Sequence, residues 1–182
     1  VTACEKSFRL LLKLHRDGRV SEEPTNYHLG HVLRVMNESP TPEAGRISLD
    51  LFRLMDSLCN NGKIKFQPDA YNIRQLLGTV ALSEEPGHGT YTEELLDRIL
   101  TNGSKPDSFD ADVFGHLFWC VVSCYCNDNS AESLRRAGVV LDRLARLHLE
   151  QPATVRVTGG AFKAIVAGWA FVGGAGAGEQ SQ

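Results

Sequence analysis

Residues 47–58, ISLDLFRLMDSL, decide the fold of this 182-residue chain. Their apolar side chains recur every three or four positions and so share one face of a helix. These apolar residues are Ile47, Leu51, Leu54, Met55 and Leu58. Arg53 stands inside this apolar frame, next to Phe52. The segment therefore predicts an amphipathic helix that carries an arginine in its apolar region.

The same arginine frame recurs along the chain. Arg9, Arg53, Arg98 and Arg143 follow one another at nearly constant intervals of 44, 45 and 45. A second series of apolar pairs, out of phase with the arginines, recurs with a similar period: Val32-Leu33, Leu76-Leu77, Leu117-Phe118 and Ile165-Val166. Periods of about 40–45 residues are typical of helical solenoids, propellers and arrays, which mostly bind other molecules. Two interleaved series predict two elements in each repeat.

The remaining periodic segments also follow helical spacing. Residues 95–100 and 134–144 carry apolar stripes, and Ser130 is positioned to cap the second of these helices. Residues 113–126 and 161–172 are apolar almost all round, which is typical of helices buried between neighbours. No segment alternates over the length of a strand, so we predict an all-α chain.

Proline and glycine mark the predicted boundaries between helices. Each helix of the second series follows a proline, and three arginine helices are followed by a glycine. The prolines are Pro24, Pro68, Pro106 and Pro152, and the glycines are Gly18, Gly62 and Gly103. These boundaries predict an α-solenoid of antiparallel helical hairpins with about three to four repeats. The array spans residues 1–172, with repeats at 24–67, 68–105, 106–151 and, in part, 152–172, and residues 173–182 form a flexible Gly/Ala-rich tail.

Short motifs within this pattern resemble those of the pentatricopeptide repeat (PPR) proteins. They are Lys105-Pro106-Asp107, Gln67-Pro68-Asp69, Ala70-Tyr71-Asn72 and Ala167-Gly168-Trp169-Ala170. The resemblance implies a stack of helical hairpins that binds RNA, mostly in mitochondria and plastids. The family repeat is about 35 residues, close to the 34-residue period of tetratricopeptide (TPR) repeats. The repeats of this chain are longer, which predicts longer loops and second helices.

The resemblance also implies how RNA bases would be read, through one polar residue early in a repeat's first helix and another just before the next repeat. Alignment places Gly30, Arg74, Gly115 and Lys163 at the early position. None of them has the hydroxyl or amide side chain that the family uses there. Asp69 and Asp107 match the residue before a repeat.

Charge supports two interpretations. The chain carries a net charge of −3, whereas a dedicated nucleic-acid binder usually has a basic face. The helices that would line the concave surface nevertheless carry Arg34, Arg74 and Lys163, with His31 nearby. These four residues form a candidate groove for RNA phosphates, with weak and salt-sensitive affinity. The alternative is that they are ordinary solvated residues.

We interpret the four regularly spaced arginines as structural. A residue at the same place in every repeat can cover the neighbouring hairpin with its aliphatic stem, or pair with acids such as Asp50, Glu94 and Asp97.

The five cysteines predict a reducing compartment and no metal site. Their number is odd and their spacing shows no pairs. His116, Cys120 and Cys124 follow one helix face, but positions eight apart lie about 12 Å apart and cannot share one ion. Cys126 follows closely behind Cys124, and Cys4, Cys59 and His148 are not spaced like zinc ligands.

Enzyme signatures are also missing, so we predict no enzyme, no cofactor and no small-molecule substrate. The glycine-rich residues 173–178 follow a helix and do not have the strand-turn-helix context of a phosphate-binding loop. His88 stands in the glycine turn at 84–89 without an evident nucleophile.

The ends of the chain predict a processed protein or part of a longer one. The sequence begins at Val1, shows no signal-peptide pattern, and has apolar runs too short to span a bilayer. The last apolar helix has no partner helix after it, so we expect Phe162, Ile165, Val166 and Trp169 to form a partner-docking face.

Two functions follow from these observations. The first is a PPR-like scaffold or adaptor that binds proteins within a large assembly in the mitochondrial matrix or plastid stroma. The alternative is an organellar RNA-binding PPR factor that acts in RNA processing, stability or translation.

Overall fold

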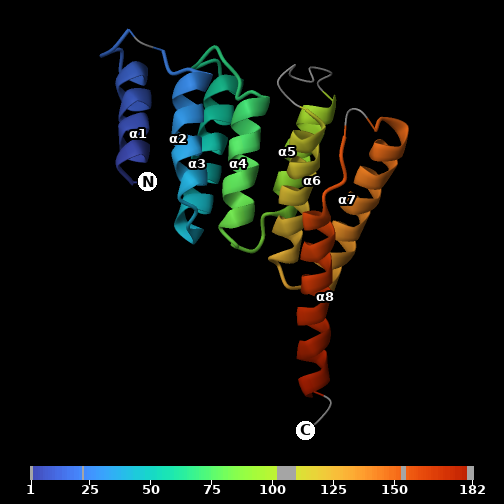
Figure 1. Ribbon diagram of the computed structural model, residues 1–182. Coiled ribbons are helices and arrows are strands. Elements are labelled where there is room, and N and C mark those ends of the chain that lie inside the picture. The colour runs from blue at the N-terminus through green and yellow to red at the C-terminus, as the bar shows by residue number, and fades with distance from the viewer. Residues whose placement is uncertain (1, 22, 102–109, 153–154, 180–182) are drawn as a thin grey trace. The chain divides into compact units, whose positions relative to one another are not determined.

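The all-α prediction is confirmed for the part of the chain that the structure describes. The computed structural model describes residues 2–21, 23–101, 110–152 and 155–179. These residues form eight helices and no strand (Figure 1). The helices are α1 Thr2–Arg16, α2 Asn26–Glu38, α3 Pro42–Asn60, α4 Ala70–Leu82, α5 Gly89–Thr101, α6 Ala111–Cys126, α7 Ala131–Glu150 and α8 Gly159–Glu179.

Local sequence explains where several helices begin and end. The Thr41 hydroxyl oxygen accepts a hydrogen bond from the Ala44 N–H at 3.0 Å, and Pro42 occupies the first turn of α3. Ser130 caps α7 in the same way, at 3.1 Å from the Ser133 nitrogen, as the sequence predicts. Gly18 and Gly62 follow α1 and α3 with φ angles of 66° and 65°, a conformation that favours glycine. Gly103 and Pro106 lie outside the described residues.

The chain divides into two units, residues 1–83 and 84–182. The first contains α1 to α4 and the second contains α5 to α8. The boundary falls within residues 68–105, the range for which the sequence predicts a single repeat. Each unit is therefore described by itself.

In the first unit, α2 is the central helix. It packs on α1, α3 and α4, and α3 packs on α4 (Figure 1). Fully buried side chains from these helices form the core, among them Leu33, Phe52 and Leu76. A buried polar contact joins α2 and α3 in this core, where the Ser48 hydroxyl donates to Met36 Sδ at 2.9 Å.

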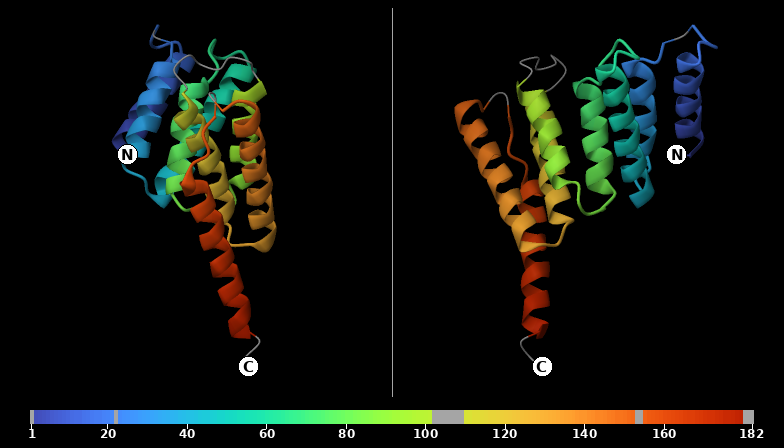
Figure 2. Two further views of the ribbon diagram at one scale, coloured as in Figure 1. Left: turned by 45° about the vertical axis from the view of Figure 1, so that its right-hand side comes forward. Right: turned by 180° about the vertical axis from the view of Figure 1, so that it is seen from behind.

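The second unit has the same order of contacts. Its central helix, α6, packs on α5, α7 and α8, and α7 packs on α8 (Figure 2). α6 is buried over most of its surface, as its apolar sequence predicts. α8 differs, because one face packs on α6 and α7 while its large apolar side chains at 162, 166, 169 and 171 are exposed.

The final helix is longer than the sequence suggests. α8 continues through Glu179, although the glycines at 173–178 lead us to expect a flexible tail at 173–182. Glycine costs about 1 kcal/mol relative to alanine in a helix interior, so these last turns have the weakest intrinsic helical preference. No helix in the described part of the chain combines the length and the apolar character needed to cross a bilayer.

Candidate functional site

The first unit contains a surface hollow of about 490 Å³ between α2 and the start of α4. We call it the α2/α4 groove. Its lining residues come from both helices and from the cap of α4: Asn26, Tyr27, Gly30, His31, Arg34, Asp69 and Tyr71.

Helical spacing and two caps place these side chains. Tyr27, His31 and Arg34 recur at intervals of four and three residues, so they share one face of α2. Thr25 caps α2, and its backbone N–H donates to His28 Nδ1 at 3.2 Å. Asp69 caps α4 by accepting the Asn72 N–H at 2.9 Å. This capping hydrogen bond, which has a structural role, holds the Asp69 carboxylate at the mouth of the groove.

Gly30 allows α4 to begin close against α2. A Cβ atom at this position would lie 3.1 Å from both Tyr71 Cε1 and Asn72 Nδ2. Asn72 Nδ2 in turn donates to the Asn26 carbonyl oxygen at 3.1 Å. Beside the groove, the buried oxygens Asn26 Oδ1 and Asn72 Oδ1 accept no hydrogen bond from the described residues. The groove therefore has a tightly packed wall and two unmatched acceptors.

The open side of the groove is aromatic and weakly basic. The Tyr27 ring meets the His31 ring edge to face, with centroids 4.3 Å apart. Arg34 Nη2 lies 3.4 Å from His31 Nδ1, and Arg34 Nη1 lies 3.9 Å from Glu38 Oε1. Tyr27 is 72% exposed and Tyr71 is 43% exposed. Chemically, the groove offers two accessible rings for stacking, one cation and one carboxylate.

The structure gathers only some of the residues that the sequence singles out. Gly30, His31, Arg34 and Asp69 line this groove. Arg74, on α4, is half-buried and is not among the lining residues. Sequence reasoning missed Tyr27 and Tyr71 as groove residues. The signal was present, because Tyr27 precedes His31 by one helical turn and Tyr71 follows the Pro68-Asp69-Ala70 entry.

The other residues aligned with the base code lie elsewhere. Gly115 and Lys163 belong to the second unit, on α6 and α8, and Asp107 lies outside the described residues. A Cβ atom on Gly115 would lie 2.1 Å from the Arg156 carbonyl oxygen. The Arg156 N–H also donates to the Ala111 oxygen at 3.0 Å, which holds this segment against α6. Position 115 is therefore covered by the chain that leads into α8.

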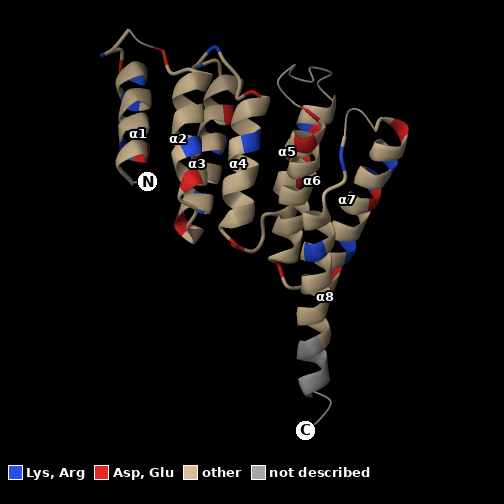
Figure 3. Cartoon of the chain, viewed as in Figure 1, with Lys and Arg blue, Asp and Glu red and all other residues tan. Residues whose placement is uncertain are grey.

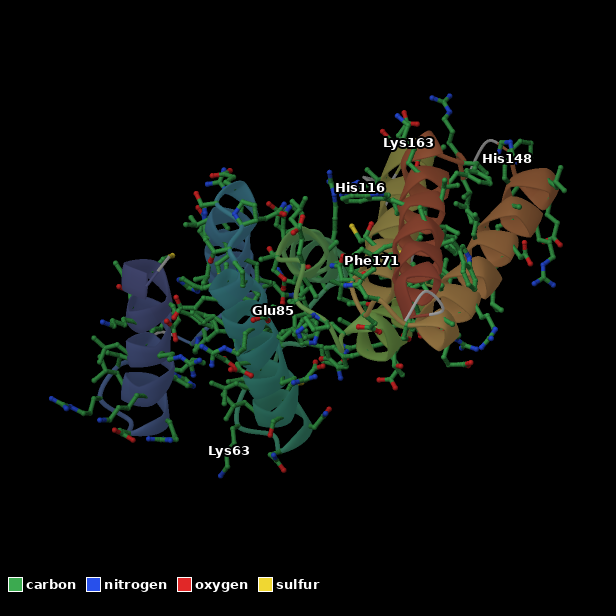
Figure 4. The ribbon with its side chains drawn as sticks, turned by 90° about the horizontal axis from the view of Figure 1, so that it is seen from below. Lys63, Glu85, His116, His148, Lys163 and Phe171 are labelled. Carbon is green, nitrogen blue, oxygen red and sulfur yellow. The ribbon has the colours of Figure 1, made fainter. Side chains whose placement is uncertain are left out.

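The exposed face of α8 is the second candidate site. Phe162, Val166 and Trp169 share this face of the helix and are between 42% and 68% exposed, and Ile165 is half-buried. Phe171 is also exposed, but it lines a hollow together with Ala164 and Gly168 on the other side of α8. Lys163 is the single charged residue between positions 159 and 178, and in Figure 3 the described part of α8 is tan apart from one blue segment. Figure 4 labels Lys163 and Phe171 at two positions along this helix. We call this surface the α8 face.

The opposite side of α8 is closely packed. Ala161 is fully buried, and a Cβ atom on Gly168 would lie 2.5 Å from Leu134 Cδ2 of α7. Small residues thus bring α8 against its neighbours, which leaves Phe162, Val166 and Trp169 on the other side of the helix. Sequence analysis predicts the exposure of the docking residues Phe162, Val166 and Trp169, but also predicts a helix buried on all sides, which is wrong.

The cysteines and histidine of α6 do not gather into a larger site. Cys120 Sγ lies 3.6 Å from His116 Nε2, and among the described residues no three His, Cys, Asp or Glu side chains are placed to hold a metal ion. Burial raises the pKa of the Cys124 thiol to about 12 and that of Cys126 to about 11. Both thiols are therefore protonated at neutral pH and are poor nucleophiles.

The regularly spaced arginines Arg9 and Arg143 have ion-pair partners within their own units. Arg9 Nε lies 2.6 Å from Glu5 Oε1 on α1. Arg143 on α7 pairs with Asp97 on α5, one of the acids that the sequence suggests as partners. These two contacts are the kind that a structural role requires.

A scan against models of known protein families finds no match to this chain, and searches of curated proteins and of solved structures find no significant match either.

Proposed function

We propose that this chain is a non-catalytic, PPR-like helical-repeat scaffold that binds protein partners within a large assembly. The α8 face carries this proposal. Three large apolar side chains that share one face of α8, Phe162, Val166 and Trp169, are exposed, and the helix bears a single charge from position 159 to 178. Contiguous exposed apolar surface in a protein is typical of a protein interaction site, and aromatic residues dominate the energy of such sites.

Matching contacts in the two units support a solenoid of hairpins. Gly30 on α2 faces Tyr71, and Gly115 on α6 faces Arg156. The two residues of each facing pair are separated by the same number of positions in the sequence. Gly78 faces Asn37 and Gly160 faces Trp119 across that same interval. Because each central helix also packs on the helices before and after it, the pairs α2/α4 and α6/α8 behave as equivalent neighbours in a repeat.

The test of the scaffold is capture of partners by matched variants. Val166→Glu with Trp169→Glu places two carboxylates on the α8 face. Val139→Glu with Leu149→Glu does the same on exposed positions of α7 in the same unit. We expect proteins captured by the tagged chain to persist after RNase treatment, to be lost with the α8 variant and to remain with the α7 control. Equal capture by both variants, or loss of all partners with RNase, would contradict the proposal.

We place the assembly in the mitochondrial matrix or plastid stroma, on the basis of the PPR-like motifs and of five cysteines without disulfide spacing. Fractionation of cells with an antibody against the native protein checks this location. Signal confined to the soluble cytosolic fraction would contradict it.

The α2/α4 groove favours a second candidate function, organellar RNA binding. Its two exposed tyrosines and Arg34 are suited to stack on a base and to contact a phosphate. Asp69 in the same groove opposes phosphate binding, which is why we rank this function second.

A pair of variants distinguishes stacking from general electrostatics. Stacking contributes about 1–3 kcal/mol per base. Tyr27→Ala with Tyr71→Ala should therefore weaken binding of single-stranded RNA at least tenfold, while Tyr27→Phe with Tyr71→Phe should keep most of it. Fluorescence anisotropy measures both. If neither the native chain nor the Phe variant binds RNA, the second function is wrong.

A further inference from the structure

Helix α1 presents a basic stripe that neither proposed function has used. Lys6, Arg9, Lys13 and Arg16 recur at three- or four-residue intervals and so share one face of the helix. Glu5 is the single acid in α1, although the whole chain carries a net charge of −3. Figure 3 shows the basic residues distributed along the length of α1. Positive charge is thus concentrated on one helix of an acidic chain.

The stripe borders a hollow with apolar walls. A pocket of about 240 Å³ lies between α1 and α3 and is lined by three cations and three leucines: Arg9, Leu12, Lys13, Arg16, Leu54 and Leu58. Leu54 and Leu58 are only half-buried, and they lie one turn apart on α3. We call this feature the α1/α3 groove. It combines an apolar floor with a cationic rim.

The charges on the rim are only partly neutralised. Arg9 pairs with Glu5, and Arg16 Nε lies 3.4 Å from Asp17 Oδ1. Lys6 and Lys13 form no ion pair with any described residue. Part of the basic character is explained by the helix itself, because Lys13 and Arg16 in the last turn interact favourably with the helix dipole. The helix dipole explains basic residues in the last turn, but it does not explain the apolar groove beneath them.

We propose that the α1/α3 groove binds an acidic amphipathic helix of a protein partner, an inference that rests on the scaffold function and names the chemistry of one partner. A helix laid in the groove would insert apolar side chains between the leucines and place carboxylates against the lysine and arginines. Cations at positions 9, 13 and 16 match carboxylates spaced four and three residues apart on the partner helix.

Other occupants fit the groove less well. The lining has no aromatic side chain, so single-stranded nucleic acid would find cations there but nothing on which to stack. A membrane surface is met by a projecting apolar face, whereas the leucines here are recessed between two helices. A neutral apolar segment would leave the cationic rim without a partner. An acidic amphipathic helix provides both carboxylates for the cationic rim and apolar side chains for the leucine floor.

The probe is a fluorescein-labelled peptide of about 15 residues, long enough to form a helix when bound. It consists of leucine at helical spacing and glutamate elsewhere, and a control peptide has glutamine in place of every glutamate. We expect the acidic peptide to bind the full chain in a salt-sensitive manner, measured by anisotropy, and the glutamine peptide to bind at least tenfold more weakly. Absence of binding by the acidic peptide, or equal binding of both peptides, would overturn the inference.

Two charge-reversal variants locate the site. Arg9→Glu, Lys13→Glu and Arg16→Glu together should weaken peptide binding at least tenfold. The matched control reverses three other exposed cations of the same unit, Arg46→Glu, Lys63→Glu and Lys65→Glu, and should change binding less than twofold. Equal losses in both triple variants would show long-range electrostatics and overturn the site.

Two further measurements keep the result independent of folding and of the α8 face. Lys13→Gln with Arg16→Gln removes charge without reversing it, and should weaken binding several-fold while far-UV circular dichroism stays native. The α8 variant Val166→Glu with Trp169→Glu should bind the peptide normally. If the peptide does not bind, but capture of protein partners still depends on the α8 face, this inference is wrong and the scaffold function is unaffected. Tighter, α1-dependent binding of a single-stranded RNA or of anionic vesicles would replace it.

Discussion

Arg136 on α7 holds the carboxylate of Glu93 on α5 through two hydrogen bonds, from Nε to Oε2 and from Nη2 to Oε1, each 2.9 Å long. The Tyr125 hydroxyl on α6 donates to the same carboxylate at 2.6 Å. Glu93 is buried, so these bonds replace the water that its charge has lost. Three helices of the second unit are thereby joined at one side chain.

Removal of Arg136 should destabilise the second unit. Among the described residues, Arg136→Ala leaves the buried carboxylate with the Tyr125 hydroxyl as its one side-chain partner, and we expect a loss of about 1–3 kcal/mol in the free energy of unfolding. Both tryptophans, Trp119 and Trp169, lie in this unit, so urea unfolding followed by tryptophan fluorescence reports on it.

The neighbouring Arg135 provides the control for this change. It pairs with Glu132 at 3.0 Å, but the two side chains are 66% and 86% exposed. Arg135→Ala should therefore cost less than about 0.5 kcal/mol. A loss from Arg136→Ala no greater than that from Arg135→Ala would show that the bidentate contact contributes little to stability.

Stability should fall at alkaline pH. Burial raises the pKa of Cys124 from 9.0 to about 12 and that of Cys126 from 9.0 to about 11, and burial and the Glu93 hydrogen bond raise the pKa of Tyr125. Below pH 9 the thiols are protonated in both the folded and the unfolded chain, so full stability is present there. Between pH 9 and the folded pKa values only the unfolded thiols ionise, which favours unfolding by up to about 1.4 kcal/mol per pH unit for each group.

Urea midpoints from far-UV circular dichroism at pH 8 and about pH 10 measure this effect. Cys126→Ala removes one of the groups and should make the alkaline decrease shallower. A native chain that is equally stable at both pH values would contradict the assigned burial of the thiols.

Gly115 should tolerate no side chain. A Cβ atom would lie 2.1 Å from the Arg156 carbonyl oxygen, a backbone atom that also belongs to a hydrogen-bonded segment. Gly115→Ala should therefore destabilise the second unit by about 1–3 kcal/mol, because the segment before α8 must move. Gly138 on α7 has nothing within 4 Å of its Cβ position, so Gly138→Ala should instead stabilise by up to about 1 kcal/mol. Urea unfolding followed by tryptophan fluorescence gives both values, and similar shifts for the two substitutions would be inconsistent with this packing.

The cysteines should separate into two classes of reactivity. Cys4 and Cys59 are half-buried, whereas Cys120, Cys124 and Cys126 are buried. Thiolate is the reactive species, and burial keeps Cys124 and Cys126 protonated. With iodoacetamide at pH 8 we expect modification of the first two cysteines, and of all five only after urea is added. Peptide mass spectrometry assigns the sites, and rapid labelling of Cys124 in the folded chain would contradict the structure.

The helices themselves could be read from the sequence, because their signals are local. The apolar spacing of residues 47–58 lies within α3, Ser130 caps α7, and Gly18 and Gly62 end two helices as expected. The helical glycines at 173–178 are an exception. Composition there suggests a flexible end, yet α8 continues to Glu179.

The candidate sites could be predicted only in part. The aligned repeat positions point to Gly30 and Asp69, and the basic residues of the helices expected to line the concave surface point to His31 and Arg34. These four residues line one groove. Tyr27 and Tyr71 are not among the predicted groove residues, although their positions before His31 and after the Pro68-Asp69-Ala70 entry are visible in the sequence, because the prediction considers only the aligned repeat positions and the charged residues. Gly115 was aligned with Gly30, but whether position 115 is open depends on the distant segment at Arg156, which no local pattern around Gly115 could reveal.

The sequence by itself determined that the described chain is helical, where several of its helices begin or end, and which residues form their apolar stripes. Those properties depend on residues three or four positions apart, whose contacts form within a single helix. The tertiary structure alone decided the division at residues 83 and 84, the burial of Glu93 beneath Arg136, and the side of α8 that stays exposed. The last two depend on contacts between side chains that are far apart in the sequence, and the packing of whole helices, rather than local spacing, brings those side chains together.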